Sequence, residues 1–139
     1  MFGKKKIEYI YEPTGTSITD FGDDRLRLEY GRSSNDLSEV HEQATWIAKT
    51  LNAIRQVHGS KGNFRILADL KKLYTLSLDD HARVLYKAII EQPFVDKVAV
   101  VGDAFSFTKV LTISVLLPQK DKKFKFFFSI PEARKWLKW

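Results

Sequence analysis

The second half of this chain alternates strand-like and helix-like segments three times, and this alternation restricts its fold more than any other feature. Runs of β-branched, aromatic and other apolar residues predict strands at 64–69, 95–102 and 124–128. Stretches of helical character follow at 79–91, 103–117 and 131–139. Apolar runs that end in Asp or Gly are typical of parallel strands covered by helices. We therefore predict an α/β fold with a mixed, mostly parallel sheet of four to five strands.

The N-terminal part adds antiparallel structure to this sheet. Residues 7–12 indicate a first strand, and the turn sequence Pro13-Thr14-Gly15 follows it. Residues 25–30 alternate polar and apolar side chains after a second turn, as a strand with one buried face does. We expect these segments to form an antiparallel hairpin or meander.

Helix-start signals divide the middle of the chain. Asp36 and Glu39 have the spacing of a capping box and predict the start of a long helix. Ser77 is the predicted N-cap of the next helix. The segment 104–117 fits either a helix or a strand. As a helix it would carry more apolar surface than one sheet face needs, and that excess indicates either a partner surface or deep burial.

Composition favours one globular domain spanning 1–139, with residues 1–6 as a basic N-terminal tail. The chain has 139 residues, 44% of them hydrophobic, which is enough for a sizeable core. It has no cysteine, which suits a reducing compartment. Since no apolar stretch has the length of a signal peptide or a membrane span, we predict a soluble, cytoplasmic protein.

The positive charge is concentrated near the C-terminus. Residues 120–139 contain seven Lys or Arg and two acidic side chains, whereas residues 1–119 carry a balance of +1. The predicted basic face consists of Lys123, Lys125, Arg134, Lys135 and Lys138. Such a face either attracts phosphates and acidic partners or is simply solvated.

Lysines and phenylalanines alternate in the predicted strand at 124–128. An edge strand with a buried aromatic row and protective lysines has this pattern. Strands that bind single-stranded nucleic acid have it too, when their rings are exposed. We favour the edge strand and do not expect nucleic-acid binding.

Motifs for catalysis are absent from the sequence. The three histidines lack the helical spacing of zinc ligands, and Asp79-Asp80-His81 is explained by the preference for acidic residues at helix starts. Neither a G-x-S-x-G nucleophile turn nor a glycine-rich phosphate loop occurs. We predict no enzyme activity, no metal site and no cofactor.

The carboxyl ends of the predicted parallel strands are the most promising place for a binding site, because open α/β sheets usually bind ligands there. The candidate binding residues at these ends are Asp69, Ser77, Gly102, Asp103 and Ser106. Phe105 and Leu116 are the candidates for an apolar partner surface.

Four segments carry a resemblance to a known family. They read YGRSSNDLSEV, ILADLKKL, VDKVAVVGD and FKFFFSIPEARKWL. Together they resemble STAS-like domains, which are related to anti-sigma-factor antagonists, and especially the small stand-alone bacterial members often grouped with CRAL-TRIO-type lipid-binding domains. The resemblance covers about residues 24–139. It implies a mixed sheet with helices and a non-enzymatic role in binding or regulation.

The antagonists of this family carry a phosphorylated serine at a helix start after the strand that ends in Asp-Leu. In this sequence the corresponding pair is Ser77-Leu78, so the phosphoacceptor position is Leu78 and Ser77 comes one residue early. The resemblance therefore does not extend to the phosphoacceptor itself.

Three functional hypotheses follow from the sequence. The first is a regulatory domain that binds another protein and can associate with itself. The second is a carrier that holds a lipid or other small hydrophobic ligand under the Phe-rich C-terminal half. The third is a binder of anions or nucleic acid that uses the basic face.

Overall fold

The computed structural model describes residues 6–59, 63–116 and 123–139. The strands are β1 (Ile7–Tyr11), β2 (Thr16–Asp20), β3 (Arg25–Glu29), β4 (Phe64–Asp69), β5 (Val95–Val101) and β6 (Phe124–Phe127). The helices are α1 (Leu37–His58), α2 (Asp80–Ile90), α3 (Ala104–Ser114) and α4 (Ile130–Leu137).

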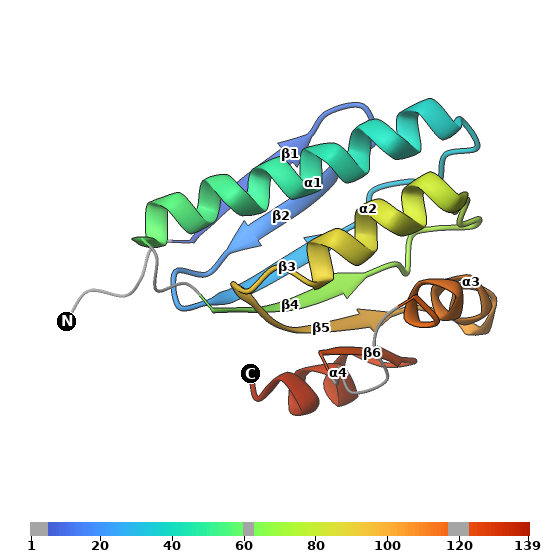
Figure 1. Ribbon diagram of the computed structural model, residues 1–139. Helices are drawn as coiled ribbons and strands as arrows, with labels where there is room; N and C mark the ends of the chain where they lie inside the picture. The colour runs from blue at the N-terminus through green and yellow to red at the C-terminus, as the bar shows by residue number, and fades with distance from the viewer. Residues whose placement is uncertain (1–5, 60–62, 117–122) are drawn as a thin grey trace.

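The strands form one sheet in sequence order, β1-β2-β3-β4-β5-β6. β1, β2 and β3 pair antiparallel as a meander, and β3 to β6 pair in parallel (Figure 1). The predicted α/β class and antiparallel N-terminal segment are confirmed. The predicted count of four to five strands is wrong, because all three strands of the N-terminal meander belong to the sheet, which continues through the β3–β4 ladder.

Helices cover both faces of the sheet. α1, α2 and α3 pack on one face around a large apolar cluster that includes Leu26, Ile66 and Val98. α4 packs on the other face, where its Ala133 and Leu137 meet residues of β4, β5 and β6. Figure 1 shows α1 and α2 lying side by side over the strands, with α4 on the other side of β5 and β6. Each parallel strand therefore leads into a helix, and the helices cover the sheet, as predicted.

The start of α2 corrects the prediction for Ser77. The Asp79 carboxylate is the N-cap and accepts the Ala82 N–H at 2.8 Å, while Ser77 lies in the preceding loop. A carboxylate at this position satisfies a free N–H and also carries the charge that the helix dipole favours. Asp79 therefore provides the cap more effectively than a serine two residues earlier.

The ambiguous segment 104–117 forms a helix over Ala104–Ser114, so the alternative of a strand is wrong. Asp103 caps this helix by accepting the Ser106 N–H at 2.9 Å. Leu117 lies outside the described residues.

Candidate functional site

Helix α3 has a buried side and an apolar exposed side. Val110 and Ile113 pack into the core, whereas Phe105 is 53% exposed and Leu111 is 43% exposed. The turn after the helix exposes Val115 and Leu116 as well. On a helical wheel the exposed residues occupy the arc opposite Val110 and Ile113. The excess apolar surface predicted for this segment therefore faces outward, and Phe105 and Leu116 lie on it.

An aromatic cluster attaches this helix to the last strand. The ring centroid of Phe107 lies 5.2 Å from that of Phe126 and 5.7 Å from that of Phe128. Phe128 is itself 60% exposed and continues the apolar surface beyond the end of β6. We call this area the α3–β6 surface. It consists of Phe105, Lys109, Leu111, Val115, Leu116 and Phe128.

The α3–β6 surface stands out from the rest of the described chain. The described residues include eleven large hydrophobic side chains that are exposed, and five of them belong to this surface. Lys109 is exposed among them, four residues after Phe105 and so on the same side of the helix. β6 is the last strand in the sheet order, which confirms the predicted edge position, although its aromatic row is only partly buried and Phe128 is exposed. The surface therefore combines apolar side chains, a cation and a sheet edge that no described strand covers.

Three of the five predicted carboxyl-end residues come together. Gly102 and Asp103 lead from β5 into α3, and the buried Ser106 lies on the first turn of that helix. A Cβ on Gly102 would lie 3.1 Å from the Ser106 Cβ and 3.2 Å from the Phe126 ring. The amide N–H groups at this helix start hold the pKa of Asp103 below its usual value, the Ser106 N–H above all. These contacts are structural, since they fix α3 against β6.

The other two predicted residues lie elsewhere. Asp69 is buried, and its carboxylate accepts from Arg27 at 3.0 Å and from the Lys71 N–H at 2.9 Å. Ser77 is half-buried beside Arg32 in a small cleft between two loops. The five predicted binding residues therefore do not form a single site.

The predicted basic face is divided in a similar way. The Lys123 ammonium donates to the Ile90 and Gln92 carbonyl oxygens at 3.1 and 3.2 Å, near the C-terminal end of α2. The Lys125 ammonium lies 5.3 Å from the centroid of the Phe127 ring, on the α4 face of the sheet. Arg134, Lys135 and Lys138 are exposed on α4 and at its end. The positive charge therefore surrounds the β6 edge and does not form one flat patch.

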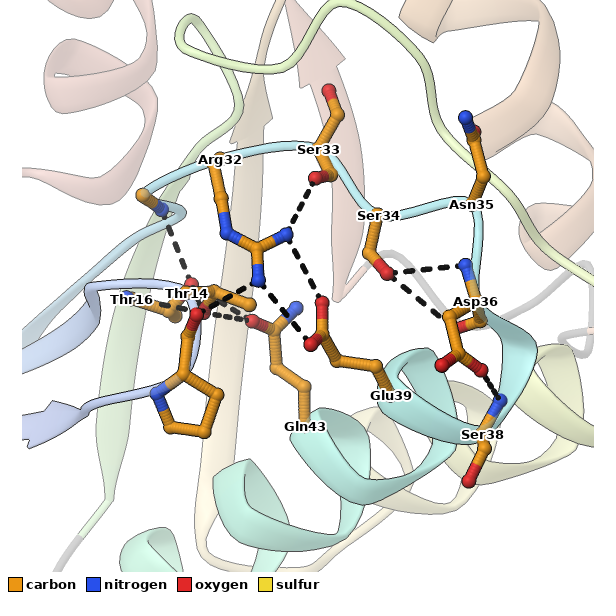
Figure 2. A network of polar contacts seen from close by, with 12 residues as sticks. Thr14, Thr16, Arg32, Ser33, Ser34, Asn35, Asp36, Ser38, Glu39 and Gln43 are labelled. Carbon is orange, nitrogen blue, oxygen red and sulfur yellow. Dashed lines mark hydrogen bonds and ion pairs between the residues drawn. The ribbon is translucent and has the colours of Figure 1, made fainter.

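Arg32 joins three segments at the carboxyl edge of the sheet. Its guanidinium forms an ion pair with Glu39 of α1 at 3.1 Å and donates to the Pro13 carbonyl oxygen at 2.8 Å. It also donates to the Ser33 carbonyl oxygen at 3.1 Å. Figure 2 shows this guanidinium pointing toward Glu39, with Gln43, Thr14 and Thr16 close by. The arginine therefore holds the β1–β2 turn and the β3–α1 loop against the start of α1.

A buried polar network lies next to this arginine. The Gln43 carbonyl oxygen accepts from the hydroxyls of Thr14 and Thr16 at 2.6 and 2.8 Å. The Gln43 side chain also lies near the Tyr86 hydroxyl and acts to lower the pKa of that phenol. The Tyr30 hydroxyl donates to that same hydroxyl at 2.8 Å. The network therefore runs from the β1–β2 turn through α1 to α2.

An apolar cavity of about 80 Å³ lies between the sheet and helices α1, α2 and α3. Its lining comes mostly from Leu, Ile and Val side chains of the large core cluster, with Val110 and Ile113 of α3 at one side. Tyr30 and Tyr86 are the lining residues with polar side-chain atoms. Burial raises the pKa of Tyr30 well above its usual value and also raises that of Tyr86. The two hydroxyls are therefore neutral at physiological pH.

Two His–Asp pairs occupy structural positions. His41 of α1 meets the Asp79 cap of α2 at 2.9 Å. His58, at the end of α1, contacts the buried Asp20 of β2 at 2.7 Å. Among the described residues, no group of three or more His, Asp or Glu side chains is placed to hold a metal ion.

Arg32, Gln43 and the tyrosine pair are the residues that the sequence analysis did not identify. The available signals were a glutamine on the mostly apolar stripe of α1 and two tyrosines at core positions. Neither signal identifies a contact partner.

No family model, curated protein or solved structure matches this chain. Within the described ranges, none of the helices combines the length and apolar character needed to cross a bilayer.

Proposed function

We propose that this chain is a non-catalytic α/β binding domain that docks an acidic segment of another protein on the α3–β6 surface. The observation that carries this proposal is the clustering of exposed apolar side chains on a helix and a sheet edge within the most basic part of the chain. Exposed apolar clusters of this kind, surrounded by charge, mark protein interaction sites.

The charge distribution favours an acidic partner. Residues 104–139 contain eight basic and two acidic side chains, a balance of +6, which equals the net charge of the entire chain. Residues 1–103 contain fifteen of each sign. Complementary charge raises the association rate and excludes partners of like charge. A second copy of this chain would bring two such basic regions together, so the charge favours an acidic partner over self-association.

The open edge of the sheet favours a protein over an anionic membrane. The outer backbone groups of β6 face no described strand, because β6 ends the sheet order. An extended peptide satisfies such N–H and C=O groups by adding a strand. The hydrocarbon region of a bilayer has no groups that could pair with them.

The resemblance to STAS-like domains supports the same class of role, since it implies binding or regulation without catalysis. The second hypothesis from the sequence, a carrier of a hydrophobic ligand, is supported by the apolar cavity. That cavity lies mainly beneath α1 and α2, nearer the centre of the sheet than we expected.

The proposal can be tested with a fluorescein-labelled peptide that alternates glutamate with valine and phenylalanine. We expect Phe105→Ser to weaken binding by about tenfold, as loss of a central aromatic contact does. Lys109→Gln should weaken binding by about two- to fivefold, and added salt should remove that difference.

Matched controls come from α1. Val57→Ser and Lys49→Gln remove an exposed hydrophobic side chain and an exposed cation far along another helix, and should leave binding unchanged. Binding that is equally sensitive to both pairs of variants would refute the proposed surface. Binding to vesicles of anionic lipid, with no peptide binding, would assign the surface to membranes instead.

A further inference from the structure

The cavity beneath helices α1, α2 and α3 has the form of a small-molecule site. Nineteen described residues line it, and seventeen of them have wholly apolar side chains. Its volume of about 80 Å³ is roughly half that of an engineered cavity of about 150 Å³ that binds benzene. A molecule of a few heavy atoms fits this space.

The two polar groups of the lining lie together on the side of the cavity near the carboxyl edge of the sheet. Tyr30 directly follows β3, and Tyr86 lies on α2 above it. The opposite side is formed by residues such as Leu26, Val98 and Phe124. An apolar pocket with a few polar groups at one point is the usual form of a site that orients its ligand.

The hydrogen-bond inventory at this point leaves capacity for a ligand. A tyrosine hydroxyl has one proton to donate and an oxygen that accepts. The Tyr86 oxygen accepts the Tyr30 hydroxyl at 2.8 Å, so the proton of Tyr86 itself is left to donate. That proton can meet a ligand oxygen.

The absence of charge from the described lining excludes ionic ligands, because burying an unpaired charge costs far more than a small cavity can return. We propose that this cavity binds a small neutral molecule, such as a short-chain ketone or alcohol, whose oxygen accepts from the Tyr86 hydroxyl and whose carbon chain extends toward the apolar side. This site is independent of the α3–β6 surface.

A small outer cleft lies next to the tyrosine side of the cavity. The loop from 70 to 79 covers the tyrosine side with Leu76 and Leu78, which line both the cavity and the small outer cleft. The Ser33 hydroxyl oxygen holds this loop in place by accepting the N–H groups of Tyr74 and Thr75 at 2.6 and 3.0 Å. Loosening of these two bonds would open the cleft toward the cavity.

The experiment compares 2-butanone with xenon, which fills apolar cavities but cannot accept such a hydrogen bond. Binding is followed by NMR of the cavity methyl groups, including those of Ile47, Ile66 and Val98, in the full chain. We expect both probes to shift these signals in the wild-type protein. Tyr86→Phe should weaken butanone binding by about fivefold, the loss typical of one hydrogen bond, and leave xenon binding unchanged.

Tyr74→Phe is the matched control, because Tyr74 is 90% exposed, and it should change neither affinity. Should Tyr86→Phe disturb the fold, the wild-type protein is titrated with 2-butanone and with 2-methyl-1-butene, which has a similar shape and no oxygen, and equal affinities would overturn the proposal. Butanone that leaves the cavity methyl signals unshifted would overturn the proposal. Equal butanone affinity in the wild-type protein and the folded tyrosine variant would overturn it as well.

Discussion

The hydroxyls of Tyr30 and Tyr86 lie 2.8 Å apart and connect the end of β3 to the middle of α2. Both side chains line the apolar cavity, and the hydrogen bond gives the buried Tyr30 hydroxyl a partner. The pair therefore links α2 to the end of β3.

This pair predicts a loss of stability at alkaline pH. The folded protein holds the pKa of Tyr30 well above its usual value, mainly by burial and then through Tyr86, whereas the unfolded chain titrates near pH 10. The stability contributed by neutral Tyr30 is complete below the unfolded pKa and is lost as pH rises toward the folded pKa. Urea midpoints between pH 8 and 11 should fall less steeply for Tyr30→Phe than for the wild-type protein. If the urea midpoints of the two proteins fall equally steeply with pH, Tyr30 ionises normally in the folded state.

The contacts of Arg32 predict that its substitution has a local effect on the β1–β2 turn, at the carboxyl edge of the sheet. Arg32→Lys should loosen the β1–β2 turn, because lysine cannot donate to the carboxylate and two carbonyl oxygens in one plane. Glu39→Gln removes only the exposed charge pair and should cost about 0.2–1 kcal/mol. Amide hydrogen exchange at Gly31 measures the loosening, because its N–H donates to Thr16 within the same network. Unchanged exchange in Arg32→Lys would show that the arginine does not hold the turn.

The surroundings of Gly31 and Gly102 predict which of the two alanine substitutions destabilises the protein more. A Cβ on Gly31 would lie 2.1 Å from the Thr14 carbonyl oxygen, a backbone atom that cannot move alone. A Cβ on Gly102 would meet Ser106 and the Phe126 ring at 3.1 and 3.2 Å. We expect Gly102→Ala to cost about 1–3 kcal/mol and Gly31→Ala to cost more. Denaturant unfolding that ranks them in the opposite order would contradict the packing described for the β3–α1 loop.

The cap of α2 predicts that substitutions of Asp79 and Ser77 have different effects on stability. Asp79→Ala should lower the melting temperature, and Ser77→Ala should leave it nearly unchanged, because the Ala82 N–H is bound by Asp79. The two substitutions thus distinguish the observed helix start from the one predicted by the sequence. An equal effect of both would contradict the observed cap.

Asp79 also makes the stability of the protein depend on pH in the acid range. The Ala82 N–H and then His41 hold its pKa below the usual value, so its contribution is present above the unfolded pKa and is lost as pH falls through the folded pKa. We expect Asp79→Asn, which keeps a capping oxygen, to flatten the acid limb of a stability profile below about pH 4. Identical acid limbs for the wild-type protein and Asp79→Asn would show that the cap does not lower the pKa of the Asp79 carboxyl group.

The sequence was sufficient to predict the parallel part of the fold, and the physical reason lies in local patterns. The runs predicted at 64–69, 95–102 and 124–128 coincide with β4, β5 and β6 to within one residue at each end. Each of these strands lies between helices with clear capping residues. Alternation and capping are local in sequence, so they can be read from it directly.

The candidate sites depended on contacts that local patterns do not encode. Tyr30 and Tyr86 are 56 positions apart in the chain, and Thr14 and Gln43 are 29 apart. The apolar excess of 104–117 was visible in the sequence, but only the packing of Val110 and Ile113 determines which residues face outward. The five predicted binding residues do not form one site, because the Asp69 carboxylate pairs with Arg27 and Ser77 lies in a loop.

The most direct test of the proposed function is an NMR titration of the full chain with the acidic peptide, followed through its backbone amides. We expect the largest shifts in α3 and β6, together with slower amide exchange at the outer edge of β6, because the peptide would add a strand there. Shifts centred on α1 or on α4, with none in α3 and β6, would contradict docking at this surface.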